Sequence, residues 1–324
     1  MEQICTMKIL VVGAGAIGGY FGGRLLEQKR DVTFLVRPKR AAQLAETGLV
    51  IRSRMGDFSL AAPPTVLAEN LHNQFDLIVL SCKAYDLENA IASFAPAVGA
   101  NTAILPLLNG MRHLDMLDDR FGKEHVLGGQ CFIAATVNEH HEIVHLNEAH
   151  DLSFGERSGE MSDRVRAIAD EFKGTRCNAR LSTEIMLEMW EKWVFITSAA
   201  GATCLMRASI GDILSAPGGK EFILGLLGEC RSVAEAESYP PREASVARAL
   251  TTLTTPASSL TASMLRDIEH SAPIEADHIV GDMLLRGAER NIPKEKLVHL
   301  AIAFTHLKAY ESRRAKALAS PGKT

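Results

Sequence analysis

The sequence predicts an α/β domain in the first half of the chain and an all-α domain in the second. Up to about residue 180, short β-rich runs alternate with helical stretches, a pattern typical of βαβ units around a parallel sheet. From residue 182 onward the strand signal fades and long amphipathic helices follow. A chain of 324 residues is also long enough for two domains. We place the boundary near Arg180, which gives domains 1–180 and 181–324.

The expected elements follow from the spacing of apolar residues. In the first domain we expect strands over Lys8–Val12, Asp31–Val36, Asp76–Ser81 and Thr102–Leu107, and helices over Ala16–Lys29, Lys39–Thr47 and Asp86–Phe94. Short alternating segments in 48–70 and 126–156 predict antiparallel strands added to the parallel sheet. In the second domain we expect helices over Glu184–Thr203, Lys220–Glu237, Arg242–Thr252, Glu275–Arg290 and Lys294–Ala317.

Composition and charge argue against several classes of function. Lys and Arg number 35 and Asp and Glu 39, a formal net charge of −4, so the basic surplus that a non-specific nucleic-acid binder needs is missing. The longest uncharged stretch, 89–111, contains Pro96 and Pro106, and we expect helix, turn and strand there rather than a membrane span. The six scattered cysteines form no C-x-x-C pair, which fits a reducing compartment. We therefore predict a cytoplasmic protein that binds neither nucleic acid nor membrane.

A glycine-rich turn follows the first expected strand. Residues 8–23, KILVVGAGAIGGYFGG, place Gly13, Gly15 and Gly18 in a G-x-G-x-x-G pattern between a strand and a helix. Such a turn lets a pyrophosphate approach the backbone and places it at the helix N-terminus, here Ala16 and Ile17. The pattern predicts a Rossmann dinucleotide-binding domain. The alternative is close packing of helix on strand without a ligand.

The end of the second expected strand indicates which dinucleotide binds. An NAD binder usually carries Asp or Glu there for the ribose 2′-hydroxyl, whereas basic residues accommodate a 2′-phosphate. Residues 34–40 read FLVRPKR, with no carboxylate. This favours NADP (NADPH), with Arg37 as the first candidate ahead of Lys39 and Arg40. The alternative is a solvated basic loop.

Two polar residues follow the next expected strands. Lys83 ends the run DLIVLSCK, and Asn109 lies in LLNGM. Ligands of open α/β sheets bind outside the carboxyl ends of the strands, where both residues are expected. The alternatives are a lysine at the mouth of a loop and an ordinary Asn-Gly turn.

The sequence lacks two other arrangements that support catalysis. Reduction of a carbonyl needs a proton donor, but no tyrosine has a lysine four residues later, so the Tyr-x-x-x-Lys arrangement is absent. A histidine-rich stretch lies in expected strands and turns rather than on the helix that a H-E-x-x-H metal site needs. We expect no metal there, and interpret these residues as a polar surface edge: His140, His141, His145 and His150.

Taken together, these segments resemble the ketopantoate reductase (2-dehydropantoate 2-reductase) family. The matching segments are GAGAIGG, SCKAYD around Lys83, LLNGM around Asn109, MWEKW around Lys192, and SMLRDIEHSAPIEADHIVG from Ser263 to Gly281. The resemblance implies an N-terminal Rossmann domain, a helical C-terminal domain, and NADPH-dependent reduction of a 2-oxo acid in the cleft between them. For the typical member this reaction converts 2-dehydropantoate (ketopantoate) to pantoate in pantothenate biosynthesis.

The resemblance also implies roles for single residues. Lys192 corresponds to the family's catalytic lysine, the proton donor to the reduced carbonyl. Lys83 and Asn109 would line the nicotinamide and substrate region, and Ser263 and Glu275 would hold the substrate's carboxylate and hydroxyl groups. Without the resemblance, Lys192 would be interpreted as a surface lysine of an amphipathic helix. Glu275 would be interpreted as a carboxylate that interacts favourably with the positive N-terminal end of its helix.

The sequence departs from the family pattern along the lysine helix. The family has asparagines four and eight residues after the lysine, on the same helix face, where this chain has Ile196 and Ala200. Thr203 is the nearest replacement donor, and Val280 stands where the family often has Asn. Three functions stay open: reduction of ketopantoate, reduction of a more apolar 2-oxo acid, and non-enzymatic NADP sensing. The oligomeric state is also open, with a homodimer as one candidate.

Overall fold

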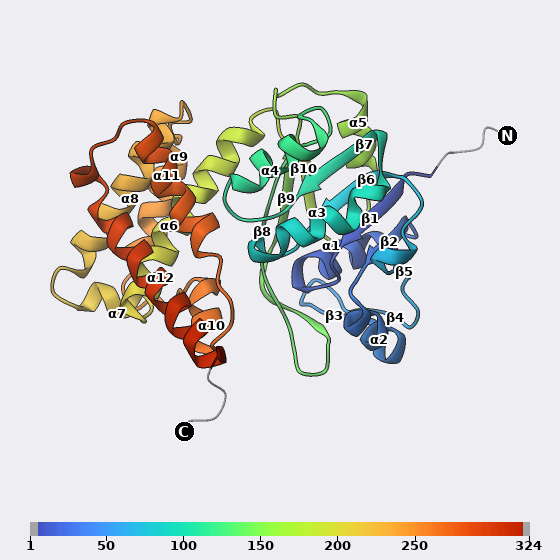
Figure 1. The fold of residues 1–324 in the computed structure, drawn as a ribbon, viewed down its shortest axis with the longest axis horizontal. Coiled ribbons are helices and arrows are strands. Elements are labelled where there is room, and N and C mark those ends of the chain that lie inside the picture. Colours follow the sequence, from blue (N-terminus) through green and yellow to red (C-terminus); the bar gives the residue numbers. More distant parts are fainter. Residues whose placement is uncertain (1–5, 320–324) are drawn as a thin grey trace. The chain divides into compact units, whose positions relative to one another are not determined.

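The computed structural model describes residues 6–319, which fall into two compact units (Figure 1). Unit 1 comprises residues 6–108 and 113–185, and unit 2 comprises residues 109–112 and 186–319. Arg180, the expected boundary, lies in the last strand of unit 1. The predicted fold class is confirmed, since an α/β unit with a parallel sheet is followed by a helical unit.

Unit 1 is built on a five-stranded parallel sheet with the order β5-β2-β1-β6-β7. The strands are β1 (Lys8–Val12), β2 (Asp31–Leu35), β5 (Thr65–Val66), β6 (Phe75–Leu80) and β7 (Val98–Pro106). Strand β1 is central because its continuous apolar run is buried on both faces, as parallel strands usually are. The chain runs from β1 to β2 on one side and later returns to β6 on the other. The carboxyl end of β1 is therefore a topological switch point, where such sheets bind ligands.

A second sheet completes unit 1, with the order β10-β9-β3-β4 and with β8 paired to β9. Its strands are β3 (Leu49–Arg52), β4 (Phe58–Leu60), β8 (Gly128–Val137), β9 (Ile143–Gly155) and β10 (Asn178–Leu181). The expected antiparallel pairs are found as β3 with β4 and β8 with β9. Two details differ. Strand β5 joins the parallel sheet, and the two expected pieces of 142–156 form the single strand β9, which pairs along β8 across a bulge.

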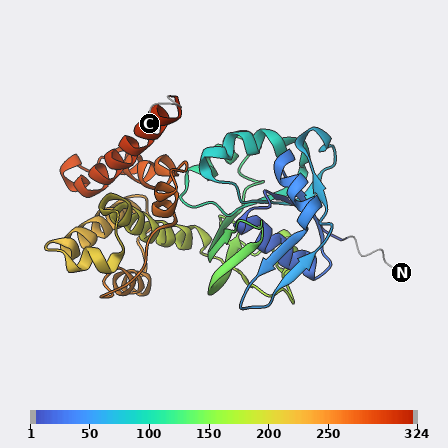
Figure 2. The ribbon, with the colours of Figure 1, turned by 90° about the horizontal axis from the view of Figure 1, so that it is seen from below.

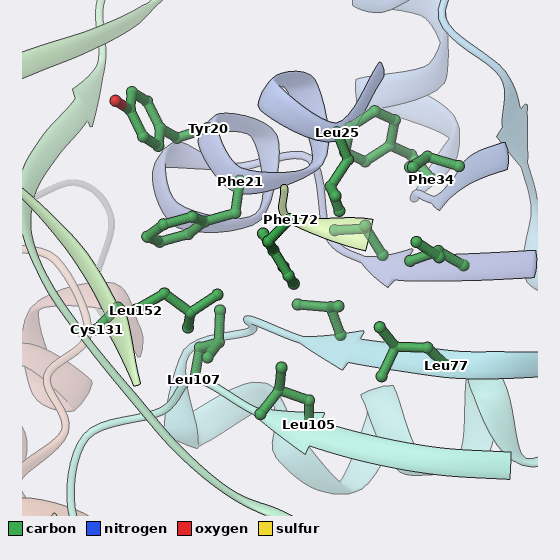
Figure 3. Packing of buried hydrophobic residues seen from close by; sticks show 14 of the residues in the cluster. Tyr20, Phe21, Leu25, Phe34, Leu77, Leu105, Leu107, Cys131, Leu152 and Phe172 are labelled. Atoms are coloured by element: carbon green, nitrogen blue, oxygen red, sulfur yellow. The ribbon is translucent and has the colours of Figure 1, made fainter. Parts of the chain in front are cut away.

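Helix α1 (Ala16–Glu27) packs between the two sheets and organises the core of unit 1. Figure 3 shows Phe21 and Leu25 on the side of α1 that faces Leu77 and Leu105 of the parallel sheet. Tyr20 points the other way, toward the second sheet (Figure 3). The remaining helices of unit 1 are α2 (Pro38–Thr47), α3 (Leu87–Phe94) and α5 (Asp163–Glu171), together with α4 (Arg112–Phe121), whose first residue belongs to unit 2.

In the described residues, unit 2 consists of helices and connecting segments (Figure 2). They are α6 (Ile185–Met206), α7 (Ile210–Ser215), α8 (Gly219–Ala236), α9 (Glu243–Leu253), α10 (Ser263–Glu269), the π-helical turn η4 (Asp277–Gly281), α11 (Asp282–Glu289) and α12 (Val298–Ala319). Helices α7 and α10 were not predicted from the sequence. The helix expected over 275–290 begins just after Glu275, and its first turn is the π-helical η4, which continues directly into α11. Across residues 6–319, no helix combines the length and hydropathy that crossing a bilayer requires.

Candidate functional site

The glycine turn after β1 has the geometry that its three glycines require. Gly13 has φ +94°, which other residues rarely adopt, and its N–H donates to the Leu35 carbonyl at 2.9 Å. A Cβ on Gly18 would lie 2.2 Å from both the Gly13 carbonyl oxygen and Ser81 Oγ, so only glycine fits there. A Cβ on Gly15 would meet nothing within 4 Å. The turn is therefore tightly packed at Gly18 and open at Gly15.

The open side of this turn leads to the N-terminus of α1. Gly15 is the N-cap of α1, and it has no side chain that could accept a hydrogen bond from the first N–H groups of the helix. The Gly19 N–H donates to the Gly15 carbonyl at 2.8 Å. The backbone N–H groups of the first turn, at Ala16 and Ile17, precede this first helical bond and are oriented for an anion. An open glycine next to a helix N-terminus is a cradle that fits the pyrophosphate of a dinucleotide.

The basic residues after β2 have different surroundings. Arg37, the N-cap residue of α2, is 69% exposed, and its Nη2 lies 2.9 Å from Asp86 Oδ1; the hydrogen bond and charge of Asp86 raise the pKa of Arg37. Arg40 reaches the glycine turn, where its Nε donates to the Ala14 carbonyl at 2.9 Å and its Nη1 to the His141 carbonyl at 3.4 Å. Its Nη2 is buried without a hydrogen-bond partner among the described residues, and burial lowers the pKa of Arg40. Arg40, ranked behind Arg37 from the sequence, is thus the one bonded to the turn.

Lys83 lies at the same edge of the parallel sheet. It is half-buried and begins the 3₁₀ turn η2 (Ala84–Asp86), three residues after β6 ends. Ser81 Oγ, between the strand and Lys83, donates to the Val12 carbonyl at 3.1 Å. This bond ties the end of β6 to the end of β1. Lys83, two residues after Ser81, therefore lies at the sheet edge that carries the glycine turn.

In unit 2, Lys192 lies on α6 and is 8% exposed. The next residue, Trp193, donates from Nε1 to the Ile279 carbonyl at 3.0 Å, and Thr197 Oγ1 donates to the same oxygen at 3.1 Å. Ile279 lies in the π turn η4, and such turns are frequent at functional sites. The two bonds hold the part of α6 that carries Lys192 against the turn that follows Glu275.

Asn109 belongs to the same unit. The next residue, Gly110, has φ +83°, and a Cβ there would lie 2.6 Å from the His278 carbonyl oxygen and 3.8 Å from Trp193 Nε1. The Asn109–Gly110 turn therefore packs directly on both α6 and η4. Glu275 itself is buried, and so is His278, whose Nε2 has no hydrogen-bond partner in the part of the chain that the structure describes. Burial, with a smaller contribution from the charge of Arg112, lowers the pKa of His278.

Thr203, expected to contact substrate, lies elsewhere in the packing. Its side chain is fully buried, and its hydroxyl donates to the Ala199 carbonyl at 2.7 Å and accepts from the Ala262 N–H at 3.2 Å. This geometry favours a structural role for Thr203 over the substrate contact predicted from the sequence. The bond to Ala262 fixes the start of α10, whose first residue is the exposed Ser263.

Only part of the histidine-rich stretch is the surface edge that we predicted: His140 is exposed. His145 and His150 are buried, and their rings stack with centroids 5.8 Å apart. Tyr20 Oη lies 3.0 Å from His150 Nδ1, and Ser53 Oγ lies 2.9 Å from His145 Nδ1. The prediction is wrong for these two residues because α1 covers this face of β9. Among residues 6–319, no group of three or more His, Cys, Asp or Glu side chains is arranged to hold a metal ion.

Two family models match the chain. One, described as "Ketopantoate reductase PanE/ApbA", matches residues 9–159, and the other, "Ketopantoate reductase PanE/ApbA C terminal", matches residues 184–309. The chain is 37% identical over 308 residues to an uncharacterized oxidoreductase, YkpB, of Bacillus subtilis, covering 95% of this chain and 100% of the relative. It is 27% identical over 297 residues to a 2-dehydropantoate 2-reductase of Mesorhizobium japonicum, covering 85% of this chain and 89% of the relative.

Solved structures of similar fold include the 2-dehydropantoate 2-reductase of Geobacter metallireducens, with a TM-score of 0.84 and 26% identity over 94% of this chain and 99% of that one. A D-mandelate dehydrogenase, solved with NADH and anilino(oxo)acetate, has a TM-score of 0.83 and 20% identity over 95% of this chain and 100% of that one. At that identity the second likeness shows the fold alone. The same fold thus occurs in proteins named for different substrates.

Proposed function

Because the chain belongs to the ketopantoate reductase PanE/ApbA family of oxidoreductases, we propose that it reduces a 2-oxo acid to the 2-hydroxy acid with NADPH. Ketopantoate is the first candidate substrate, with a role in the pantoate-forming step of pantothenate biosynthesis. The observation that carries the proposal is the bonding of Trp193 and Thr197 to the Ile279 carbonyl. These bonds hold the part of α6 that carries Lys192 against the turn that follows Glu275, which supports a role for both residues in one site.

Unit 1 supplies the groups that would hold the dinucleotide. The open position above Gly15 and the N-terminus of α1 would bind the pyrophosphate. Arg37 and Arg40 support a 2′-phosphate and therefore NADPH. Lys83, after β6, would contact the nicotinamide end. When bound, the cofactor supplies the hydride for the carbonyl carbon.

Unit 2 supplies the groups for the substrate and its proton. Lys192, which is buried on α6, would donate a proton to the oxygen of the reduced carbonyl as the general acid. Glu275 would accept a hydrogen bond from a substrate hydroxyl, and Ser263 would donate to the substrate carboxylate. The Asn109 amide, beside both α6 and η4, would orient the substrate and the nicotinamide.

A second candidate substrate is a more apolar 2-oxo acid. Ile196 and Ala200 follow Lys192 on the same face of α6, and neither side chain offers a hydrogen bond. A site without such donors discriminates weakly in favour of a hydroxylated substrate. The fold is shared with a D-mandelate dehydrogenase, so the fold does not select between these substrates.

Assembly and location belong to the same proposal. A homodimer is one candidate assembly, and a structure of similar fold at 20% identity is that of a dimeric ketopantoate reductase from Staphylococcus aureus. Light scattering after size exclusion would measure the assembly. The scattered cysteines, with no C-x-x-C pair among them, support a reducing compartment such as the cytoplasm.

Steady-state oxidation of NADPH over a panel of 2-oxo acids tests the function. We expect turnover, and we expect Lys192→Ala to lower kcat by about 100-fold or more, the usual contribution of a general acid. NADPH affinity should be unchanged, and Lys220→Ala, at an exposed lysine of α8, should behave like the wild type. Unchanged turnover in Lys192→Ala would refute the proton donor. NADPH binding without turnover of any 2-oxo acid would favour the alternative function, non-enzymatic NADP sensing.

A preference for ketopantoate within this panel would refute the more apolar substrate. A preference for an acid without a hydroxyl group would refute ketopantoate. The panel therefore separates the two substrate candidates in the same experiment that tests the lysine.

A further inference from the structure

A carboxylate lies beside the residue that follows β2, and it comes from the loop after β6. Asp86 lies in η2, after β6, and its Oδ1 is 2.9 Å from Arg37 Nη2. Strands β2 and β6 flank β1, so this ion pair joins the loops on either side of the strand that leads into the glycine turn. Residues 34–40 contain no acidic residue, and this favoured NADP. In the folded chain, however, Asp86 supplies a carboxylate next to Arg37.

We propose that Asp86 determines cofactor selectivity by competing with the 2′-phosphate for Arg37. This inference rests on the proposed dinucleotide binding. With NADPH, the phosphate takes over Arg37 and the Asp86 carboxylate is left beside a like charge. With NADH, the pair stays intact and the carboxylate accepts a hydrogen bond from the ribose 2′-hydroxyl. The chain accordingly binds both cofactors, and the Arg37–Asp86 pair sets the ratio of their affinities.

The exposure of the pair supports an exchange of partners. The Arg37 side chain is 69% exposed and that of Asp86 is 31% exposed. Ion pairs this open to water contribute little to stability, so a phosphate can displace the carboxylate. The displaced carboxylate still repels the phosphate over a few ångströms through water. Removing its charge should therefore tighten NADPH binding by about tenfold, the size expected for charges at that range.

Asp86→Asn tests this directly through the Kd values of NADPH and NADH, measured by calorimetry without substrate. We expect the Kd ratio of NADH to NADPH to rise about tenfold. Asp57→Asn is the matched control, because Asp57 forms a similarly exposed pair with Arg52, at 3.1 Å, on the β3–β4 ribbon. In that control the ratio should change by less than about twofold. In an Arg37→Met background the competition for the guanidinium is gone and only the repulsion by Asp86 remains, so Asp86→Asn should change the ratio less than it does in the wild type; equal changes in the two backgrounds would overturn the competition.

The outcomes separate this inference from the proposed function. A wild type that binds neither dinucleotide overturns the proposed function and this inference with it. A wild type that binds dinucleotide, with an Asp86→Asn ratio raised less than about fivefold, overturns this inference alone and leaves the reductase proposal standing. Matched thermal unfolding of all variants ensures that each ratio refers to folded protein.

Discussion

Alanine at Gly15 should weaken dinucleotide binding without destabilising the fold. The position has φ −84° and ψ −160°, which alanine adopts without strain, and its new Cβ would meet nothing within 4 Å. Replacing glycine by alanine at an N-cap costs about 0.5–1 kcal/mol, and the smaller entropy of the unfolded chain offsets about 0.4–1 kcal/mol. The free energy of unfolding should therefore change by less than about 1 kcal/mol.

The loss of affinity follows from the space that the methyl group fills. The Cβ would occupy the open side of the turn, through which a phosphate reaches the N–H groups of α1. Losing one such bond to a charged group costs about 1.5–3 kcal/mol, which raises Kd by about 10- to 100-fold. Calorimetric titration with NADPH measures this effect, and thermal unfolding measures the stability.

Gly18→Ala is the contrasting variant. Its Cβ would lie 2.2 Å from the Gly13 carbonyl oxygen and 3.2 Å from Val11 Cγ1, and a backbone carbonyl cannot turn aside as a side chain can. Overpacking of this kind costs about 1–3 kcal/mol or more, so Gly18→Ala should lower Tm by several degrees. If Gly15→Ala binds NADPH with wild-type affinity, the claim that the open side of the glycine turn holds the pyrophosphate is refuted. A fall in Tm for Gly15→Ala as large as that for Gly18→Ala would refute the packing argument.

Three further predictions concern the supporting structure. Thr197→Val removes one donor to the Ile279 carbonyl and should lower the free energy of unfolding by about 1 kcal/mol in urea denaturation; an unchanged midpoint would contradict this. Arg242→Met removes the side-chain bonds to the buried Glu191 carboxylate and should cost about 3 kcal/mol in the same assay, whereas a loss below about 1 kcal/mol would show that water replaces them. Burial and a neighbouring imidazole lower the pKa of His150, so below about pH 6.5 the unfolded chain binds a proton that the native state refuses. Stability should be full above that pH and fall below it, and His150→Gln should make the slope smaller; an unchanged slope would contradict the assignment to His150.

The parts of the fold that depend on local sequence were predicted well. Strand β1 was predicted with its observed bounds, and α1 begins at the expected Ala16, because the apolar run, the glycines and the helix start are contiguous. Helices α4, α5, α7 and α10 were missed. For α7 and α10 the reason is their length, since six or seven residues are too few for a periodic apolar pattern. Strand β9 appeared as two pieces because its continuity depends on pairing with β8, which its own residues do not reveal.

The candidate site was predictable in its residue types and less so in its contacts. The sequence brought forward Lys192, Glu275 and the glycines as candidates, but not the buried His278 of η4. No local signal pairs Arg37 with Asp86, because the two lie 49 positions apart and meet only when β2 and β6 flank β1. In each case the missing information is the long-range packing that the sequence pattern does not contain.

Transfer of deuterium from labelled NADPH tests the central claim most directly. The protein would be incubated with ketopantoate or another 2-oxo acid and NADPH deuterated at C4, using each of the two C4 epimers in turn, and the product analysed by mass spectrometry. We predict one deuterium at C2 of the 2-hydroxy acid from one epimer only, with the rate reduced about 100-fold or more in Lys192→Ala. Binding of NADPH with no deuterated 2-hydroxy acid from any substrate would contradict the claim.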